Sequence, residues 1–216
     1  MEPGPAPNAP SAELRAAFGG LDLYLFDQLL RGRFDRRRRV LDAGCGDGRN
    51  LPYFLSHGFD CFGIDREASA IAHVRSVAAQ RAPGLPPDHF HAGEIESLPW
   101  DTASMDAVIS SAVLHFASDE AHFGRLLREM WRVLAPDGLF FARLASNIGL
   151  EDAIGPARRV ASLPDGSERF IVDEGMLMEW TGRLGGRLID PIKTTIVQRQ
   201  RCMTTWCVVK TGPGGT

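Results

Sequence analysis

Three glycines at alternate positions in residues 44–48 come directly after a short apolar run at residues 39–43. Glycine allows a sharp turn and lets a ligand approach main-chain N–H groups closely. A second apolar run, at residues 60–64, ends at Asp65, and an acid there can accept hydrogen bonds from both hydroxyls of a ribose. The two features predict a nucleoside site at the carboxyl edge of a parallel sheet.

The charges around this loop favour S-adenosylmethionine over NAD. A dinucleotide pyrophosphate requires a helix N-terminus free of negative charge. Asp42 and Asp47 flank the loop, and this arrangement suits a ligand that carries an amine and a sulfonium. A nicotinamide-dependent reductase is therefore the third-ranked interpretation of the chain.

Apolar runs and amphipathic segments alternate along most of the sequence. After the first two strands, further strands are expected at about 89–92, 105–110 and 139–144, and helices at 49–57, 67–79, 118–134 and 173–184. Such alternation predicts a parallel sheet with helices on both faces. Two β-rich runs at 187–197 and 201–209 predict a terminal antiparallel hairpin.

The remaining segments define the expected domain organisation. Residues 1–11 are rich in proline and alanine and predict a disordered leader. Residues 12–34 predict an N-terminal helical cap, because leucines recur at helical spacing. Residues 146–172 have weak periodicity and are expected to cover the substrate. The whole of 12–216 is expected to form one domain.

Composition narrows the function classes. The net charge of −3 gives no field that would attract nucleic acid. No apolar run approaches the roughly 20 residues that cross a bilayer. The four cysteines have neither a disulfide framework nor metal-ligand spacing, so no metal is expected. These features predict a soluble, cytoplasmic protein that acts without a membrane or nucleic-acid partner; its oligomeric state stays open.

The sequence V-L-D-A-G-C-G-D-G-R-N at residues 40–50 resembles the first motif of class I S-adenosylmethionine-dependent methyltransferases. It is especially similar to the small tellurite-resistance and thiopurine groups. The resemblance continues in register at residues 63–65, 92–99, 105–115 and 130–139. It implies an α/β, Rossmann-like fold with a seven-stranded, mostly parallel sheet in the order 3-2-1-4-5-7-6. The antiparallel seventh strand agrees with the expected terminal hairpin.

The resemblance also implies which residues hold the cofactor. Asp42 and the glycine loop would hold the methionine part, Asp65 the ribose, and Glu94 with the backbone of Ile95 the adenine. Tyr24 and Gln28, one helical turn apart, could fold over the cofactor or form an ordinary helix surface. The expected cofactor-binding set is Tyr24, Gln28, Asp42, Gly44, Cys45, Gly46, Asn50, Asp65, Arg66, Glu94, Ile95 and Ser110. For Cys45, steric fit is a better explanation than thiol chemistry.

Methyl transfer is an in-line displacement, so the enzyme must mainly align the reacting atoms and exclude water. A general base is needed only if the nucleophile arrives protonated. His115, after the fourth strand, could be that base or orient a substrate, or it could be a structural histidine. Arg143, and more weakly Arg201, are candidate anion binders, which would suit an anionic substrate.

The end of the fourth strand bears on the acceptor. Methyltransferases acting on exocyclic amines of nucleic-acid bases usually carry an Asn/Asp/Ser-Pro-Pro-aromatic motif there, whereas residues 110–113 read Ser-Ser-Ala-Val. We therefore expect transfer of a methyl group to a small-molecule nucleophile. The alternative is a non-catalytic S-adenosylmethionine-binding regulatory protein. The C-terminal third matches no substrate group of the tellurite-resistance pattern.

Overall fold

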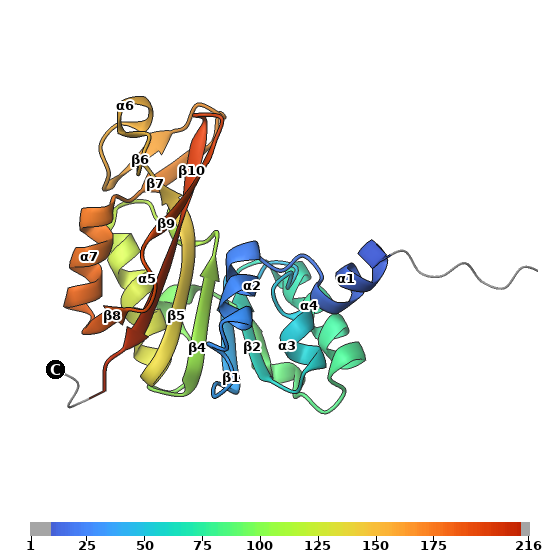
Figure 1. Cartoon of the computed structure of the whole chain (residues 1–216). Helices are drawn as coiled ribbons and strands as arrows, with labels where there is room; N and C mark the ends of the chain where they lie inside the picture. Colours follow the sequence, from blue (N-terminus) through green and yellow to red (C-terminus); the bar gives the residue numbers. More distant parts are fainter. Residues whose placement is uncertain (1–9, 213–216) are drawn as a thin grey trace, which may run out of the picture.

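The computed structural model describes residues 10–212, and its centre is one twisted, mostly parallel sheet (Figure 1). Five strands run parallel, and β10 is antiparallel beside β5. The order across the sheet is β3-β2-β1-β4-β5-β10-β8, with β9 also paired to β10. The strands are β1 (Arg39–Ala43), β2 (Asp60–Asp65), β3 (Phe90–Ala92), β4 (Met105–Ser111), β5 (Leu134–Ser146), β8 (Gly186–Leu188), β9 (Lys193–Val197) and β10 (Arg201–Lys210).

The expected strand order is confirmed, with a difference in detail. The strand predicted over 187–197 is broken into β8 and β9, so the sheet has eight strands rather than seven. Pro191 lies in the break, where it cannot donate a ladder hydrogen bond. Asp190 in the same break points to α2 (Leu23–Leu30) and accepts from Gln28 at 2.8 Å.

Helices cover both faces of the sheet. On one face lie α2, α3 (Pro52–Ser56) and α4 (Ala68–Arg81); on the other lie α5 (Glu120–Val133) and α7 (Glu174–Arg183) (Figure 1). A hydrophobic core lies on each face of the sheet. Because side chains alternate along a strand, Phe140 packs in the core on the α5 side and Phe141 in the core on the α2 side. Asp119 caps α5 by accepting from His122 N at 2.7 Å.

Several expected boundaries are wrong in detail. The leader predicted over 1–11 is too long, because α1 (Pro10–Phe18) begins at Pro10; residues 1–9 lie outside the described part of the chain. The helix predicted over 49–57 begins only at Pro52, which takes the favoured first-turn position of α3. Strand β5 begins at Leu134 rather than at the expected residue 139, and Asp137 inside it has φ +61°.

Residues 146–172 form a small separate layer beyond the end of the main sheet. They contain α6 (Glu151–Ile154) and an antiparallel hairpin of β6 (Arg159–Ser162) and β7 (Glu168–Ile171). Figure 1 shows this layer at the end where β5 finishes and β10 begins. Short 3₁₀ helices connect other elements: η1 (Pro87–His89), η2 (Ile95–Ser97) and η3 (Leu114–Phe116). No helix between residues 10 and 212 has the length and apolar character needed to cross a membrane.

Candidate functional site

A pocket of about 290 Å³ opens at the carboxyl ends of β1 to β4. Ligands of open α/β sheets bind at this edge, where the strand order reverses. The turns after four strands supply most of the wall, and η3 and α5 close the other side. The lining residues are Gly44, Asp65, Arg66, Glu67, Gly93, Glu94, Ile95, Glu96, Ala112, Val113, Phe116, His122 and Leu126.

The glycine loop forms the pocket wall after β1 and is tied to β2. The N–H groups of Gly44 and Cys45 donate to the Ile64 carbonyl oxygen at 2.8 and 3.0 Å. Gly44 has φ +79°, and a Cβ there would lie 2.5 Å from Val113 Cγ2. The position therefore needs glycine both for its backbone angle and for the close packing of the opposite wall.

Asp65 lies where β2 enters the pocket and braces two neighbouring turns. Its Oδ2 accepts from Gly46 N at 2.8 Å, and its Oδ1 accepts from Glu67 N at 3.0 Å. A carboxylate oxygen has two lone pairs, so each oxygen retains one for a further donor. The residue is thus held in one orientation while still able to bind a diol.

Asp42, in contrast, is buried beside the pocket on β1 and does not line it. Its Oδ2 accepts from Asn50 Nδ2 at 3.4 Å, but its buried Oδ1 has no partner within residues 10–212. Burial raises the pKa of Asp42 to about 7, despite the opposing hydrogen bond from Asn50. Such a carboxylate would gain from a cationic partner.

The far end of the pocket combines an acidic turn with residues from α5 and η3. Glu94 is exposed and Ile95 is buried beside it. Glu96 accepts from His122 Nε2 at 2.7 Å, which joins the acidic turn to α5. Phe116 is exposed to 61%, with the Arg169 guanidinium 4.8 Å from its ring centroid.

Sequence reasoning did not single out Glu96, Phe116 or His122. Glu96 belongs to the 92–99 stretch that resembles the methyltransferase pattern, so the sequence could have indicated that it lies near the site. Phe116 and His122 carried none, because only the turn of the chain after β4 brings them to the pocket.

Three other expected cofactor residues lie around the pocket. Arg66 lines it and extends into solvent beside Glu67. Cys45 is buried, and its Sγ would lie 3.2 Å from a Cβ added at Gly63. Burial raises the pKa of the Cys45 thiol well above its usual range. This fits the steric role expected for Cys45. Ser110 is fully buried on β4, and its hydroxyl has no partner in the described chain.

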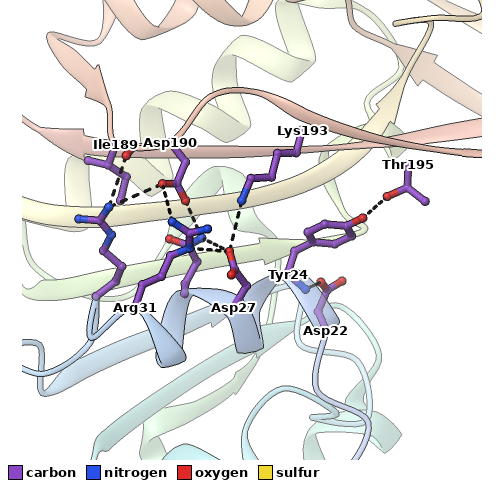
Figure 2. A network of polar contacts seen from close by, with 10 residues as sticks. Asp22, Tyr24, Asp27, Arg31, Ile189, Asp190, Lys193 and Thr195 are labelled. Atoms are coloured by element: carbon purple, nitrogen blue, oxygen red, sulfur yellow. Dashed lines mark hydrogen bonds and ion pairs between the residues drawn. The ribbon is translucent and has the colours of Figure 1, made fainter.

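The structure does not bring Tyr24 and Gln28 to the pocket. Both point from α2 to the broken strand formed by β8 and β9, and Figure 2 shows Tyr24 directed to Thr195. The Tyr24 hydroxyl bonds Thr195, and Gln28 donates to Asp190. Their expected contact with a cofactor stays a prediction that this arrangement does not support.

The candidate catalytic residues lie outside the pocket wall as well. Arg143 Nη1, on β5, donates to Asp22 Oδ2 at 2.9 Å, so its charge is already paired. His115 is buried in η3; burial and the nearby Arg169 charge lower its pKa to about 4. The imidazole is therefore neutral near pH 7, and its buried Nδ1 has no partner among the described residues. Arg201 pairs with Asp165 at 3.6 Å.

Comparison with known proteins agrees with this geometry. A methyltransferase domain model matches residues 41–142. A probable S-adenosylmethionine-dependent methyltransferase of Mycolicibacterium smegmatis is 32% identical over 111 residues, covering 51% of this chain and 39% of the relative. A malonyl-[acyl-carrier protein] O-methyltransferase of Enterobacter lignolyticus is 31% identical over 121 residues, covering 55% and 44%. The chain thus spans less than half the length of these two relatives.

A solved structure extends the likeness to nearly the whole fold. The Burkholderia thailandensis 1,6-didemethyltoxoflavin-N1-methyltransferase, with its substrate and S-adenosylhomocysteine bound, superposes with a TM-score of 0.65 at 21% identity. The match covers 97% of this chain and 94% of that one. The expected similarity to the tellurite-resistance and thiopurine groups stays a prediction. The sheet order is that of the Rossmann-like methyltransferase fold, and residues 41–142, which hold the glycine loop and Asp65, are similar to the domain of S-adenosylmethionine-dependent methyltransferases.

Proposed function

We propose that this chain transfers a methyl group from S-adenosylmethionine to a small-molecule nucleophile. The observation that carries the proposal is the orientation of Asp65, which two backbone N–H groups fix at the mouth of the pocket. Across the pocket wall, Val113 packs so close to residue 44 that only glycine fits there. The structural neighbour with bound S-adenosylhomocysteine and 1,6-didemethyltoxoflavin supports the cofactor and a small-molecule acceptor.

The residues present fit such a cofactor. Asp65 has free lone pairs for a ribose diol, and exposed Glu94 can accept from the exocyclic amine of adenine. The buried, unpartnered Oδ1 of Asp42 lies beside the pocket and would accept from the amino group of the methionine part, directly or through a water. When bound, the cofactor would supply an electrophilic methyl group on a sulfonium, which is a good leaving group.

The protein's own contribution is then orientation and exclusion of water. The glycine loop, Asp65 and the acidic turn fix one end of the ligand, while the buried end of β4 closes the site behind it. His115 is neutral near pH 7, so it is in the protonation state that a general base requires. We propose His115 as that base only for an acceptor that arrives protonated.

The direct test is calorimetric titration with S-adenosylhomocysteine. We expect micromolar binding by the wild type and about ten- to hundredfold weaker binding by Asp65→Ala, because hydrogen bonds to a charged group contribute about 1.5–3 kcal/mol. Asp60→Ala is the matched control: it removes an acid from the opposite end of the same strand and should leave affinity unchanged.

Binding of NADH in place of S-adenosylhomocysteine would contradict the proposal at the level of the cofactor. Tight S-adenosylhomocysteine binding without turnover on a broad acceptor panel would instead indicate the non-catalytic regulatory alternative. The two outcomes can be told apart. The first would contradict S-adenosylmethionine as the cofactor, whereas the second would contradict only the methyl-transfer reaction.

Asp42 predicts a pH-dependent affinity. Its pKa is raised to about 7, so below pH 7 the protein holds a proton that a cationic amine must displace. We expect S-adenosylhomocysteine affinity to rise by up to about tenfold per pH unit as the pH increases towards 7, then to level off. Calorimetry from about pH 5.5 to pH 8 measures this. Asp42→Asn should flatten the slope; an equally flat wild-type profile would show that Asp42 does not meet the amine.

A further inference from the structure

A row of polar and cationic side chains crosses the sheet on the face that α2 covers. Strand register places Ser111 opposite Arg143, Arg143 opposite Thr205, and Thr205 opposite Lys193. Directly paired residues share one face of a sheet, so these four side chains, here called the floor, form a continuous row over β4, β5, β10 and β9. The floor begins beside the cofactor pocket, since Ala112 lines that pocket and its N–H donates to the Arg143 carbonyl oxygen at 2.8 Å.

Two carboxylates of α2 and its N-cap cover the cations of this floor. Asp22 is fully buried and accepts from Arg143 Nη1 at 2.9 Å and from Ser111 Oγ at 3.1 Å. Asp27 Oδ2 lies 3.3 Å from Lys193 Nζ. Figure 2 shows Asp27 and Tyr24 reaching from α2 to Lys193 and Thr195 of β9, with Asp22 at the start of the helix.

The covered floor still contains unsatisfied polar atoms. The Thr205 hydroxyl belongs to a side chain that is 5% exposed, and it has no hydrogen-bond partner in the described chain. The Nε of Arg143 is buried and likewise unpartnered. Buried donors of this kind are uncommon, because each costs free energy comparable to a lost hydrogen bond. Arg143, Thr205 and Lys193 therefore offer more donors than Asp22 and Asp27 use.

We propose that this floor is the acceptor subsite and that it takes an oxyanion, a carboxylate or a phosphate, of the methyl acceptor. This inference rests on the proposed function. In the free protein, the carboxylates of Asp22 and Asp27 pair with the cations that would bind the ligand's oxyanion. The acceptor displaces these carboxylates when it binds. The exchange conserves the pairing of Arg143 and Lys193. This matters most for Arg143, whose side chain is 23% exposed and would be costly to leave without a counter-charge. Arg143 is thus an acceptor-binding residue, as its sequence position suggested, but one that an internal carboxylate masks.

The flanks of α2 allow such an exchange. The helix has eight residues, with Gly19 and Gly20 before it and Gly32 after it. Gly19 and Gly32 have φ +61° and +68°, a backbone region open to glycine. Leu25 is fully buried and anchors the helix, so we expect the carboxylates at its start to shift while α2 stays attached.

The position of the floor separates it from the cofactor. Thr205 is on β10, three strands from β1 and its glycine loop, which is roughly 14 Å at the usual strand spacing. Lys193 lies one strand further. A ligand that reaches both cations is therefore a second molecule beside the cofactor, with its anionic part directed away from the glycine loop.

The test uses simple probes on the full chain: glutarate, inorganic phosphate and, as an uncharged match, glutaramide. We expect Asp22→Asn to bind glutarate or phosphate at least about tenfold more tightly than the wild type, because an intramolecular carboxylate no longer competes. Asparagine still caps α2, which protects the fold. Adding Arg143→Gln to Asp22→Asn should abolish the gain, whereas adding Arg39→Gln at the opposite end of the sheet should keep it. Glutaramide should bind no variant measurably.

A second variant keeps the test decisive if Asp22→Asn folds poorly. Asp27→Asn, at a half-exposed position, should strengthen glutarate binding by about threefold and lose that gain with Lys193→Gln. Unchanged anion affinity in both asparagine variants would overturn the proposal. So would loss of glutarate binding in saturating S-adenosylhomocysteine, since the anion site would then belong to the cofactor. S-adenosylhomocysteine binding measured on each sample tests the proposed function separately.

Discussion

Gly44→Ala should weaken the affinity for S-adenosylhomocysteine by more than about a hundredfold. This is the largest effect on affinity that we expect from one added methyl group in this protein. A Cβ at residue 44 would lie 2.5 Å from Val113 Cγ2, inside contact distance, and φ +79° is unfavourable for any L side chain. The strained angle costs about 1–2 kcal/mol and the overlap about 1–3 kcal/mol. The chain can relieve both only by moving the loop or the opposite wall, and both line the pocket. Calorimetry together with thermal unfolding measures the two effects.

Gly58→Ala is a matched control for this variant. Gly58 has φ +72°, yet a Cβ there would meet nothing within 4 Å, so the substitution introduces backbone strain without overlap. We expect Gly58→Ala to lower stability by about 1 kcal/mol and leave affinity unchanged. Val113→Ala added to Gly44→Ala should recover part of the affinity. Wild-type affinity in Gly44→Ala alone would show that the loop does not meet the ligand.

The parts of the site that the sequence predicted are those built from local spacing. The alternating glycines and Asp65 each follow a short apolar run, and parallel pairing of β1 with β2 brings their ends together. Gly44, Asp65, Arg66, Glu94 and Ile95 all line the pocket. Their contact with a cofactor stays a prediction. The break in the strand predicted over 187–197 also had a local signal, because Pro191 cannot donate within a ladder.

The residues that the sequence could not place depend on contacts between distant segments. Arg143 meets Asp22 across 121 positions, and Gln28 meets Asp190 across 162. Helical periodicity places Tyr24 and Gln28 on one face of α2 but does not say which part of the sheet lies opposite that face. An arginine at the end of a strand predicts anion binding equally well whether the anion is a ligand or an internal carboxylate.

Trp206→Ala should give the largest loss of stability that we expect, about 3–5 kcal/mol in the free energy of unfolding. Trp206 is fully buried on β10, and its ring packs edge-on against Phe140 with the centroids 5.5 Å apart. Its Nε1 donates to Thr181 Oγ1 of α7 at 3.0 Å. One side chain therefore joins the antiparallel strand, its neighbour β5 and the helix above them. Urea unfolding monitored by circular dichroism measures the change, and the thermal midpoint should fall by roughly 10 °C.

Trp206→Phe separates packing from the hydrogen bond. The smaller ring keeps an aromatic contact with Phe140 but loses the donor to Thr181, so we expect it to retain more than half of the stability that the alanine variant loses. S-adenosylhomocysteine affinity should stay within about twofold of wild type in folded Trp206→Phe, since the residue belongs to the core on the α5 and α7 face and not to the pocket. An alanine variant as stable as the wild type would mean that β10 is not packed against α7 through this side chain.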